Sequence, residues 1–486
     1  MPLNLWFPCK LWIGGQWVDA KSGETFAVTN PATGEKLADV PRANAEDAVA
    51  AVEAAAKAFR QWREVSAPAR GQFLRRIHDI LLANRERLAT LLTQEQGKPI
   101  VQARGEVDYA ASFYLWYAEE TRRMGGRFVP HIDPTRRAWI EYHPVGVVAA
   151  VTPWNFPLAQ SSKKLAAALA AGCTTVLKPA TSTPLCSLAM AWVAEQAGLG
   201  NGIMNVIPGS AAAIGKVICE HPAVRAISLT GSTDTGAELM SAAGRHIKRT
   251  SMELGGNCPF IVFEDAPLDR TADDLIRLKF MANGQMCVTA NRIFVQERIA
   301  DKFAAKVKER IEKLKLANGL EEDTDIGPII DKKAVARVDK LVTDAVAKGA
   351  KLLTGGLASL PKKLEAGSFF PPTLLTNVKD DMPLVCEEIF GPVIPMLTFS
   401  TEEEVVTRAN ATEYGLAAYV YSGDSARGIR VARKVWAGIV GINEMRPLRA
   451  EVPFGGLCAS GVGHEGGPEG WLEFVEVRVF GMYEGQ

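Results

Sequence analysis

The sequence predicts an α/β protein made of two doubly wound domains, each with a mostly parallel sheet between layers of helices. Two observations predict this class. Between Val145 and Gly256, short apolar runs rich in β-formers alternate with helical stretches, and a second series of the same kind runs from FIVFEDA to about Asn443. Strands that alternate with helices pair in parallel, and apolar strands of this kind are typical of a sheet buried on both faces.

The part of the chain before these series has two other patterns. Residues 11–40 alternate apolar and polar side chains around turn signals, which predicts hairpins. From Ala45 to about Met124, apolar residues recur at helical spacing, which predicts an Ala-rich helix followed by two further amphipathic helices. The stretch RFVPHIDPTRRAWIEYHPVG then predicts a second antiparallel segment.

The elements of the two series follow in order. The first series contains the strands GVVAAVTP, CTTVLKP, IMNVIPG, AVRAISLTG and RTSMELGG, with a helix after each of the first four. The second contains strands such as RIFVQ and AAYVYS and helices such as ADKFAAKVKERIEKLK. The tail, WLEFVEVRVFGMYEG, alternates like a strand. Because nothing after it can pair with it locally, it is a candidate to extend the sheet of another subunit.

The composition excludes several classes of function. Lys plus Arg and Asp plus Glu each number 55, and this zero net charge argues against binding nucleic acid through bulk phosphate neutralisation. The two longest stretches without a formal charge, residues 142–162 and 196–215, are interrupted by prolines and polar residues, which disfavours a membrane span. No signal peptide is visible at the N-terminus, so we expect a cytoplasmic protein. The eight cysteines show no CxxC spacing, so we expect neither a metal site nor structural disulfides.

Three glycine-rich strings invite a nucleotide-binding interpretation. Residues 461–466 read GxGxxG, but too little chain follows to complete a βαβ unit. The string that starts at Gly209 is not a Walker A motif, because Val217 stands where Ser or Thr must bind Mg²⁺. Residues 231–236 are better placed, since they follow a strand and open a helix whose N-terminus attracts phosphate. A plain strand–helix turn explains this last string equally well.

Three further strings carry chemistry-bearing residues at the ends of predicted elements: Asn155 in PWNFP, Glu253 in MELGG and Cys287 in NGQMC. Together with LKPA, LTGSTDTG, EEIFGP and PFGG, in this order and spacing, they resemble the aldehyde dehydrogenase superfamily over almost the whole chain. The resemblance implies that Cys287 is the catalytic thiol, Glu253 the general base and Asn155 a donor to the oxyanion.

The chemistry of such a reaction suits these residue types. A thiolate adds to an aldehyde at neutral pH once the pKa of the thiol falls below its ordinary ~8.5. The alkoxide needs donors such as the Asn155 amide and the Cys287 backbone N–H. After hydride transfer to nicotinamide, hydrolysis of the thioester needs water activated by a carboxylate. Members that pass the acyl group to coenzyme A commonly lack this glutamate, so Glu253 favours release of the free acid.

The resemblance also implies the contacts with a nicotinamide cofactor, and these are Trp154, Lys178, Thr181, Gly209, Ser232 and Glu388. We expect Lys178 at the adenosine ribose, Ser232 at the pyrophosphate and Glu388 at the nicotinamide ribose. Members restricted to NAD often carry a glutamate at the position of Thr181, where it repels a 2′-phosphate. A small neutral side chain there predicts that NADP is accepted alongside NAD.

The nearest resemblance is to the succinate-semialdehyde dehydrogenase group, through TQEQGKP, EVDYAASFYLWYAEE, LAAALAAGC and ASGVGHEGG. Members of that group usually hold the substrate carboxylate with two arginines, and here Lys163 and Met281 occupy those positions. Arg446 and Arg449, just before PFGG, are either a substitute clamp or solvated loop charges, and both readings stay open. Ser460 is a further candidate substrate contact.

We therefore expect NAD(P)-dependent oxidation of a carboxylated semialdehyde, such as succinate semialdehyde, to the acid. The alternative is a neutral aromatic or aliphatic aldehyde, because Met281 and Met286 suit a less polar pocket. A catalytically silent protein of the same fold is disfavoured by the intact catalytic set. A redox switch beside the nucleophile is not expected, since Thr289 stands where relatives often carry a second cysteine.

The implied architecture is aldehyde dehydrogenase-like, with two doubly wound α/β domains and a small antiparallel oligomerisation extension. We expect residues 1–122 and 142–254 to form the dinucleotide-binding domain and residues 255–450 the catalytic domain. Residues 123–141 and 467–486 are the expected oligomerisation segments, which predicts a homodimer or homotetramer.

Overall fold

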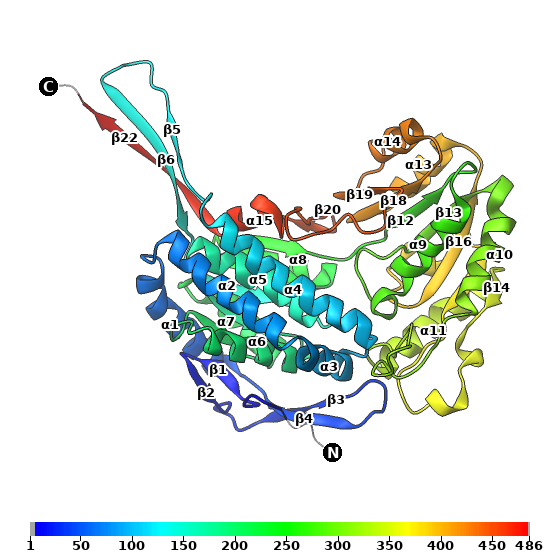
Figure 1. Cartoon of the computed structure of the whole chain (residues 1–486), viewed down its shortest axis with the longest axis horizontal. Helices are drawn as coiled ribbons and strands as arrows, with labels where there is room; N and C mark the ends of the chain where they lie inside the picture. The colour runs from blue at the N-terminus through cyan, green and yellow to red at the C-terminus, as the bar shows by residue number, and fades with distance from the viewer. Residues whose placement is uncertain (1–4, 485–486) are drawn as a thin grey trace.

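The computed structural model describes residues 5–484 and contains two α/β bodies with a strand-built arm at one end (Figure 1). Residues 1–4 and 485–486, at the ends of the predicted ranges 1–122 and 467–486, lie outside the described residues. Within residues 5–484, none of the helices has the length and apolar character that crossing a membrane requires.

The first sheet is eight-stranded, in the order β2-β1-β9-β8-β7-β10-β11-β21. Its strands are β1 (Leu11–Ile13), β2 (Gln16–Val18), β7 (Val147–Val151), β8 (Thr174–Lys178), β9 (Met204–Val206), β10 (Val224–Thr230), β11 (Arg249–Glu253) and β21 (Gly461–Val462). Strands β7 to β11 run parallel, and β1 and β21 join them antiparallel on either side. The parallel sheet predicted from the first alternating series is confirmed.

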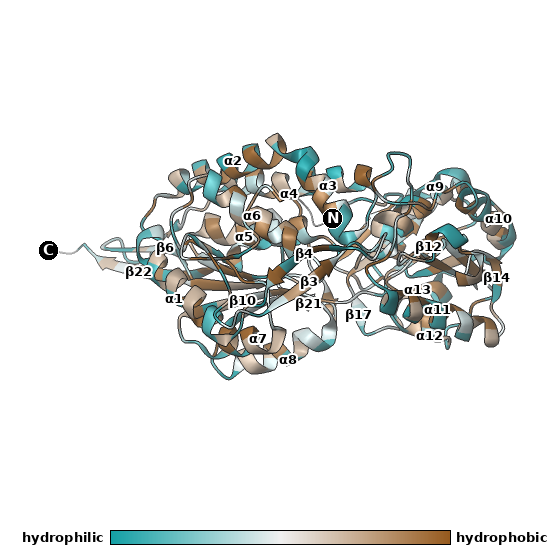
Figure 2. Cartoon of the chain, turned by 90° about the horizontal axis from the view of Figure 1, so that it is seen from below, coloured by the Kyte–Doolittle hydropathy of each residue, from teal (hydrophilic) through white to brown (hydrophobic). Residues whose placement is uncertain are grey.

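Helices cover both faces of this sheet (Figure 2). On one side lie α1 (Ala45–Trp62), α7 (Ala211–Glu220) and α8 (Thr233–Gly244), and on the other α2 (Ala67–Ala83), α3 (Arg85–Gln96), α4 (Ile100–Glu120), α5 (Pro157–Ala171) and α6 (Pro184–Gln196). In β7, Val147 and Ala149 pack with the first group, and Val148 and Ala150 with the second. Because side chains alternate along a strand, a strand that is apolar throughout fills both cores.

The stretch after α1 holds three helices, whereas the sequence predicted two. Helix α2 ends and α3 begins at Asn84, whose side-chain Nδ2 donates to the Ile80 carbonyl at 2.8 Å. Helix α3 ends at Gly97, whose φ of 95° favours glycine. The prediction was wrong because the break at Asn84 is a single residue, which does not interrupt the apolar spacing.

The second sheet is seven-stranded, in the order β14-β15-β16-β13-β12-β18-β19. Its strands are β12 (Pro259–Val262), β13 (Arg292–Gln296), β14 (Lys351–Thr354), β15 (Thr373–Thr376), β16 (Val393–Phe399), β18 (Ala417–Tyr421) and β19 (Ile439–Ile442), all parallel except β14. One face packs on α9 (Leu268–Phe280) and α10 (Ala300–Ile311). The other packs on α11 (Lys332–Ala347), α12 (Pro383–Cys386), α13 (Glu402–Asn410) and α14 (Ser425–Ala432). Short 3₁₀ turns are η1 (Met281–Gly284), η2 (Glu297–Ile299), η3 (Leu357–Ser359) and η4 (Lys362–Leu364).

Three small antiparallel sheets complete the chain. They are the hairpin β3 (Thr25–Thr29) with β4 (Lys36–Pro41), the pair β17 (Tyr414–Gly415) with β20 (Leu457–Cys458), and the arm of β5 (Arg127–Val129), β6 (Arg136–Pro144) and β22 (Val475–Tyr483). Strand β22 pairs with β6 along its whole length, so the tail does find a partner in its own chain, far away in sequence. Its other edge pairs with no described strand. Helix α15 (Gly467–Leu472), which precedes β22, packs on the first domain through Trp471, so this end of the arm begins only at β22. The predicted domain boundaries stay predictions.

Candidate active site

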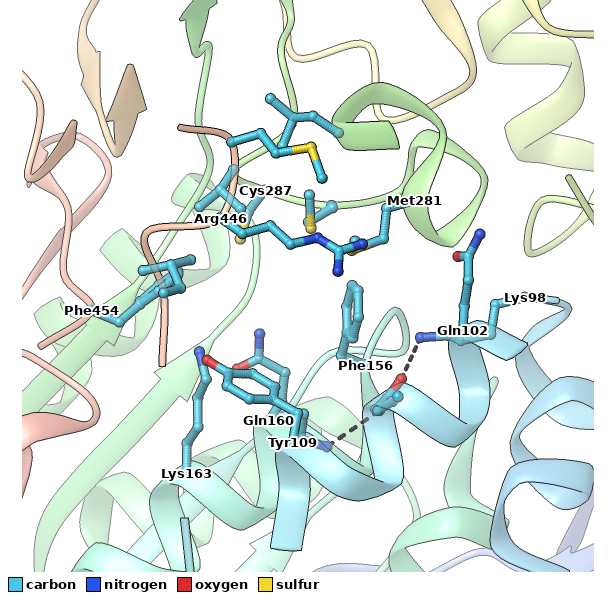
Figure 3. A pocket seen from close by; sticks show the side chains of 18 of the residues that line it. Lys98, Gln102, Tyr109, Phe156, Gln160, Lys163, Met281, Cys287, Arg446 and Phe454 are labelled. Atoms are coloured by element: carbon cyan, nitrogen blue, oxygen red, sulfur yellow. Dashed lines mark hydrogen bonds and ion pairs between the residues drawn. The ribbon is translucent and has the colours of Figure 1, made fainter. Parts of the chain in front are cut away.

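A cavity of about 450 Å³ lies between the two bodies, lined by α4, α5 and the loops 281–288 and 445–454 (Figure 3). Its lining is largely apolar, and Cys287 forms part of its wall. The charged side chains in the lining are Lys163, Arg446 and one buried ion pair. The wall of the cavity therefore contains a thiol, a largely apolar surface and a small number of cations.

An unusual turn places Cys287. Residues 282–284, one residue beyond the end of α9, have φ angles of 47°, 60° and 79°, a left-handed run that includes two residues with side chains. For a residue other than glycine, such a conformation costs on the order of 1–3 kcal/mol and persists only when its surroundings impose it. Asn283 provides that support: its Oδ1 accepts from the Gly327 backbone N–H at 2.7 Å, and its Nδ2 donates to the Pro328 carbonyl at 2.7 Å.

Asn155 lies against the same loop. It follows β7, is buried, and its Nδ2 donates to the Gln285 carbonyl at 2.9 Å. Gln285 is held in turn, because its Oε1 accepts from the Ile330 backbone N–H at 2.8 Å. The Asn155 amide has a second N–H, which no described residue accepts, so the structure brings a donor next to the loop that carries Cys287.

The electrostatics of Cys287 favour the thiol over the thiolate. Burial is the main cause that raises its pKa, and the nearby carboxyls Glu388 and Glu253 act in the same direction, while Lys163 opposes them. The lowered thiol pKa expected from the sequence is therefore not found in this structure. Without another cation at the sulfur, the raised pKa keeps Cys287 in the thiol form at neutral pH.

Glu253 ends β11 and is buried, and neither of its carboxyl oxygens has a hydrogen-bond partner among the described residues. Burial raises the pKa of Glu253 well above its ordinary value, and the neighbouring Glu465 raises it further against Lys164 and Lys163. Strand β21 pairs with β11 at this point, Gly461 opposite Glu253. The first two residues of the GxGxxG string thus form an antiparallel sheet edge beside Glu253, outside any βαβ unit.

Glu465 is a site residue that the sequence analysis missed. Lys164 donates to its carboxylate and to Ser228 Oγ, the latter at 3.1 Å, and Lys163 Nζ lies 3.6 Å from its Oε2. Although burial acts in the opposite direction, the two lysines hold the pKa of Glu465 below its usual value. Two adjacent lysines in an Ala-rich helix were the available signal, since lysines that become buried need a buried partner of opposite charge.

Of the predicted carboxylate-binding residues, Lys163 and Arg446 line the cavity and Arg449 does not. Met281, which stands where relatives carry an arginine, also lines it. Lys163 Nζ lies 3.9 Å from the centre of the Phe454 ring, and its charge is already partly balanced by Glu465. Arg446 reaches across the cavity towards Met281 (Figure 3). Its guanidinium pairs with no residue in the range 5–484.

Ser460 does not face the cavity. It is buried, its hydroxyl donates to the Gly255 carbonyl at 2.6 Å, and it accepts from the Gly415 backbone N–H at 3.0 Å. Both functions of the hydroxyl are used to tie the chain after Glu253 to β17, and the substrate contact expected of Ser460 stays a prediction.

The predicted cofactor residues gather at one edge of the first sheet. Trp154, Lys178, Gly209 and Ser232 follow or end the parallel strands β7, β8, β9 and β10, respectively. The carboxyl ends of parallel strands meet at the same edge, which is where open α/β sheets bind ligands. At Gly209 the structure requires a glycine, since a Cβ would lie 2.2 Å from the Ala43 carbonyl oxygen.

Two side chains at this edge suit a dinucleotide. Burial raises the pKa of Glu388 to about 7, and its Oε1 is buried without a partner, which fits an acceptor for ribose hydroxyls. Burial lowers the pKa of Lys178, whose amine has no side-chain partner among the described residues. Ser232 caps α8 by accepting from the Thr235 backbone N–H at 3.4 Å, and Thr181 is exposed.

The fold and this arrangement define a cysteine-dependent dehydrogenase with a nucleotide-binding sheet. The model of the aldehyde dehydrogenase family matches residues 17–480, and the chain belongs to this family. It is 46% identical over 472 residues to a glutarate-semialdehyde dehydrogenase of Pseudomonas putida, covering 97% of each chain. It is 45% identical over 466 residues to the succinate-semialdehyde dehydrogenase [NADP(+)] of Escherichia coli, covering 96% of each. A betaine aldehyde dehydrogenase from Staphylococcus aureus, solved with NAD+, superposes with a TM-score of 0.96 at 35% identity, covering 99% of this chain and 97% of that one.

Proposed function

We propose that the protein oxidises a carboxylated semialdehyde to the dicarboxylic acid with NADP or NAD. The observation that carries this proposal is the cavity that holds Cys287 together with the unpaired guanidinium of Arg446. Two relatives named for succinate and glutarate semialdehyde support the substrate class. One relative named for NADP(+) and one solved with NAD+ support the cofactors.

In the proposed reaction, the Cys287 thiolate adds to the aldehyde carbon. The free N–H of Asn155 and the backbone N–H of Cys287 stabilise the alkoxide, because donors placed before the reaction lose no energy in reorganising. The nicotinamide ring supplies the hydride acceptor when the cofactor is bound. Loss of hydride from the thiohemiacetal leaves a thioester on Cys287. Glu253, once ionised, takes a proton from the water that attacks the thioester, which releases the acid and restores the thiol.

Burial raises the pKa of both the Cys287 thiol and the Glu253 carboxyl, which makes ionisation of each group harder during the cycle. A neutral Glu253 removes one of the two carboxylate charges that raise the pKa of Cys287, while Glu388 supplies the other.

The substrate class is tested by comparing succinate and glutarate semialdehydes with butanal and pentanal, which have the same chain lengths without the carboxylate. Initial rates are followed through the absorbance of the reduced nicotinamide, with NADP and NAD in turn. We expect kcat/KM to be at least about tenfold higher for the semialdehydes, because one charge-assisted contact supplies roughly that factor. Equal or higher values for the neutral aldehydes would assign the enzyme to the neutral class instead.

We further propose that the arm of β5, β6 and β22 joins copies of the chain into a homodimer or homotetramer. Phe128, Ile132, Val479 and Tyr483 expose apolar side chains on it, and the outer edge of β22 has unpaired backbone groups. Light scattering during gel filtration should give an oligomer for the native protein and a smaller species for Val479→Lys. A monomeric native protein contradicts the proposal.

The cytoplasmic location stays a prediction from the sequence.

A further inference from the structure

An ion pair at the wall of the cavity has no part in the reaction described so far. Lys98 and Glu106 face each other near the start of α4, with side-chain exposures of 1% and 0%. Removing two charges from water is costly, and replacing such a pair by apolar residues often leaves stability unchanged or improved. The stability of the fold is therefore a poor reason for this pair, and its contacts suggest another.

Both partners hold the backbone of residues 155–159. Lys98 Nζ donates to the Asn155 carbonyl at 2.8 Å and lies 3.7 Å from the centre of the Phe156 ring. Glu106 Oε1 accepts from the backbone N–H groups of Leu158 and Ala159 at 3.0 and 3.2 Å.

These contacts complete the start of helix α5. Its N-cap position is Phe156, which has no side chain able to accept from the first turn. Glu106 supplies that acceptor from α4, and a carboxylate at a helix N-terminus is also favoured by the helix dipole. The pair thus fixes the point at which the chain leaves β7 and enters α5.

As a result, Asn155 is held through its backbone carbonyl and through its side-chain N–H group. Its carbonyl accepts from Lys98, and its side-chain amide donates to Gln285, two residues before Cys287. A shift of the backbone at residue 155 would move the amide relative to the thiol. Misplacement of a catalytic group by about 1 Å can lower a rate about 100-fold.

We propose that Lys98 and Glu106 are positioning residues, which set the place of the Asn155 amide relative to Cys287 and so determine how well the alkoxide is stabilised. The inference rests on the role proposed above for Asn155. It predicts that the pair acts on the reaction through Asn155 and through no other group.

A double-mutant cycle tests this dependence, because two changes that act through one group are not additive. Lys98→Met is made in the native protein and in Asn155→Ala, and kcat/KM is measured in both. Lys248→Met is the matched control, since Lys248, like Lys98, is a buried lysine that donates to the backbone. Its acceptors are the carbonyls of His221 and Val224, at 2.6 and 2.7 Å. If Lys98→Met does not fold, Lys98→Met/Glu106→Gln removes both charges and replaces it in the cycle.

We expect Lys98→Met to lower kcat/KM by about 10- to 100-fold in the native protein and by less than about threefold when Asn155 is already alanine. Lys248→Met should leave kcat/KM within about twofold in both. An equal loss in the two backgrounds overturns the inference and leaves the proposed function intact. If Asn155→Ala alone has no effect on kcat/KM, the role proposed for Asn155 is wrong, and the positioning role is overturned with it.

Discussion

Replacing Arg446 by alanine removes the one cation in the cavity lining that pairs with no residue in the range 5–484. A hydrogen bond to a charged group contributes about 1.5–3 kcal/mol. Because Arg446 is exposed, solvent screening reduces this to about 1–1.5 kcal/mol. About 1.4 kcal/mol corresponds to tenfold, so kcat/KM for succinate semialdehyde should fall about tenfold.

The loss should appear in KM, with kcat nearly unchanged. The carboxylate is remote from the reacting carbon, so its contact is equally strong in the ground state and in the transition state. Butanal has no carboxylate, and its kcat/KM should stay within about twofold of the native value. The assay is the absorbance of the reduced nicotinamide at saturating cofactor.

Arg449→Ala is the matched control, since Arg449 belongs to the same exposed loop and does not line the cavity. It should change neither substrate by more than about twofold. The reasoning is refuted if Arg446→Ala weakens butanal as much as succinate semialdehyde, or if Arg449→Ala has the same effect as Arg446→Ala.

Three further predictions concern single groups. Glu253→Gln should retain a burst of reduced cofactor and lose steady-state turnover by about 100-fold or more, because an amide cannot activate water; unchanged turnover contradicts the base assignment. Thr181→Glu should lower kcat/KM for NADP at least about tenfold and spare NAD, since the new carboxylate faces the 2′-phosphate; equal losses would place Thr181 away from that phosphate. Burial lowers the pKa of Lys279 to about 7, below its value of ~10.4 in the unfolded chain. Between these two pH values the unfolded chain binds more protons than the folded protein, so the free energy of unfolding rises as the pH increases. Lys279→Met should therefore raise Tm, by at least ~2 °C at pH 7 and by less near pH 10; a lower Tm at pH 7 contradicts this.

Local patterns in the sequence were enough to predict the parallel strands, because short apolar runs that alternate with helical stretches are typical of a parallel sheet covered on both faces. The motif strings placed Asn155, Glu253 and Cys287 at the ends of such elements, and the structure brings Asn155 to the loop of Cys287. Patterns of this kind depend on neighbours in sequence. They predict where a strand lies along the chain, but they do not predict which distant residues it contacts.

The residues whose surroundings were not predicted depend on distant contacts. Glu465 meets Lys164 across 301 positions, and Glu106 meets Leu158 across 52. Ser460 was expected at the substrate, yet its hydroxyl is used by Gly255, 205 positions away. No periodicity indicates such pairs, because each forms only after the sheets and helices have packed.

The route of the chain between the two bodies has a consequence for folding. The strand that carries Glu253 acquires its edge partner β21 only after the whole second sheet has been traversed, and β6 waits still longer for β22. Loop closure over such separations is slow, and open strand edges expose a folding intermediate to aggregation. During synthesis, Cys287 and Glu253 therefore exist on the ribosome well before the site around them can close, and the reactive thiol acquires its enclosure late in folding.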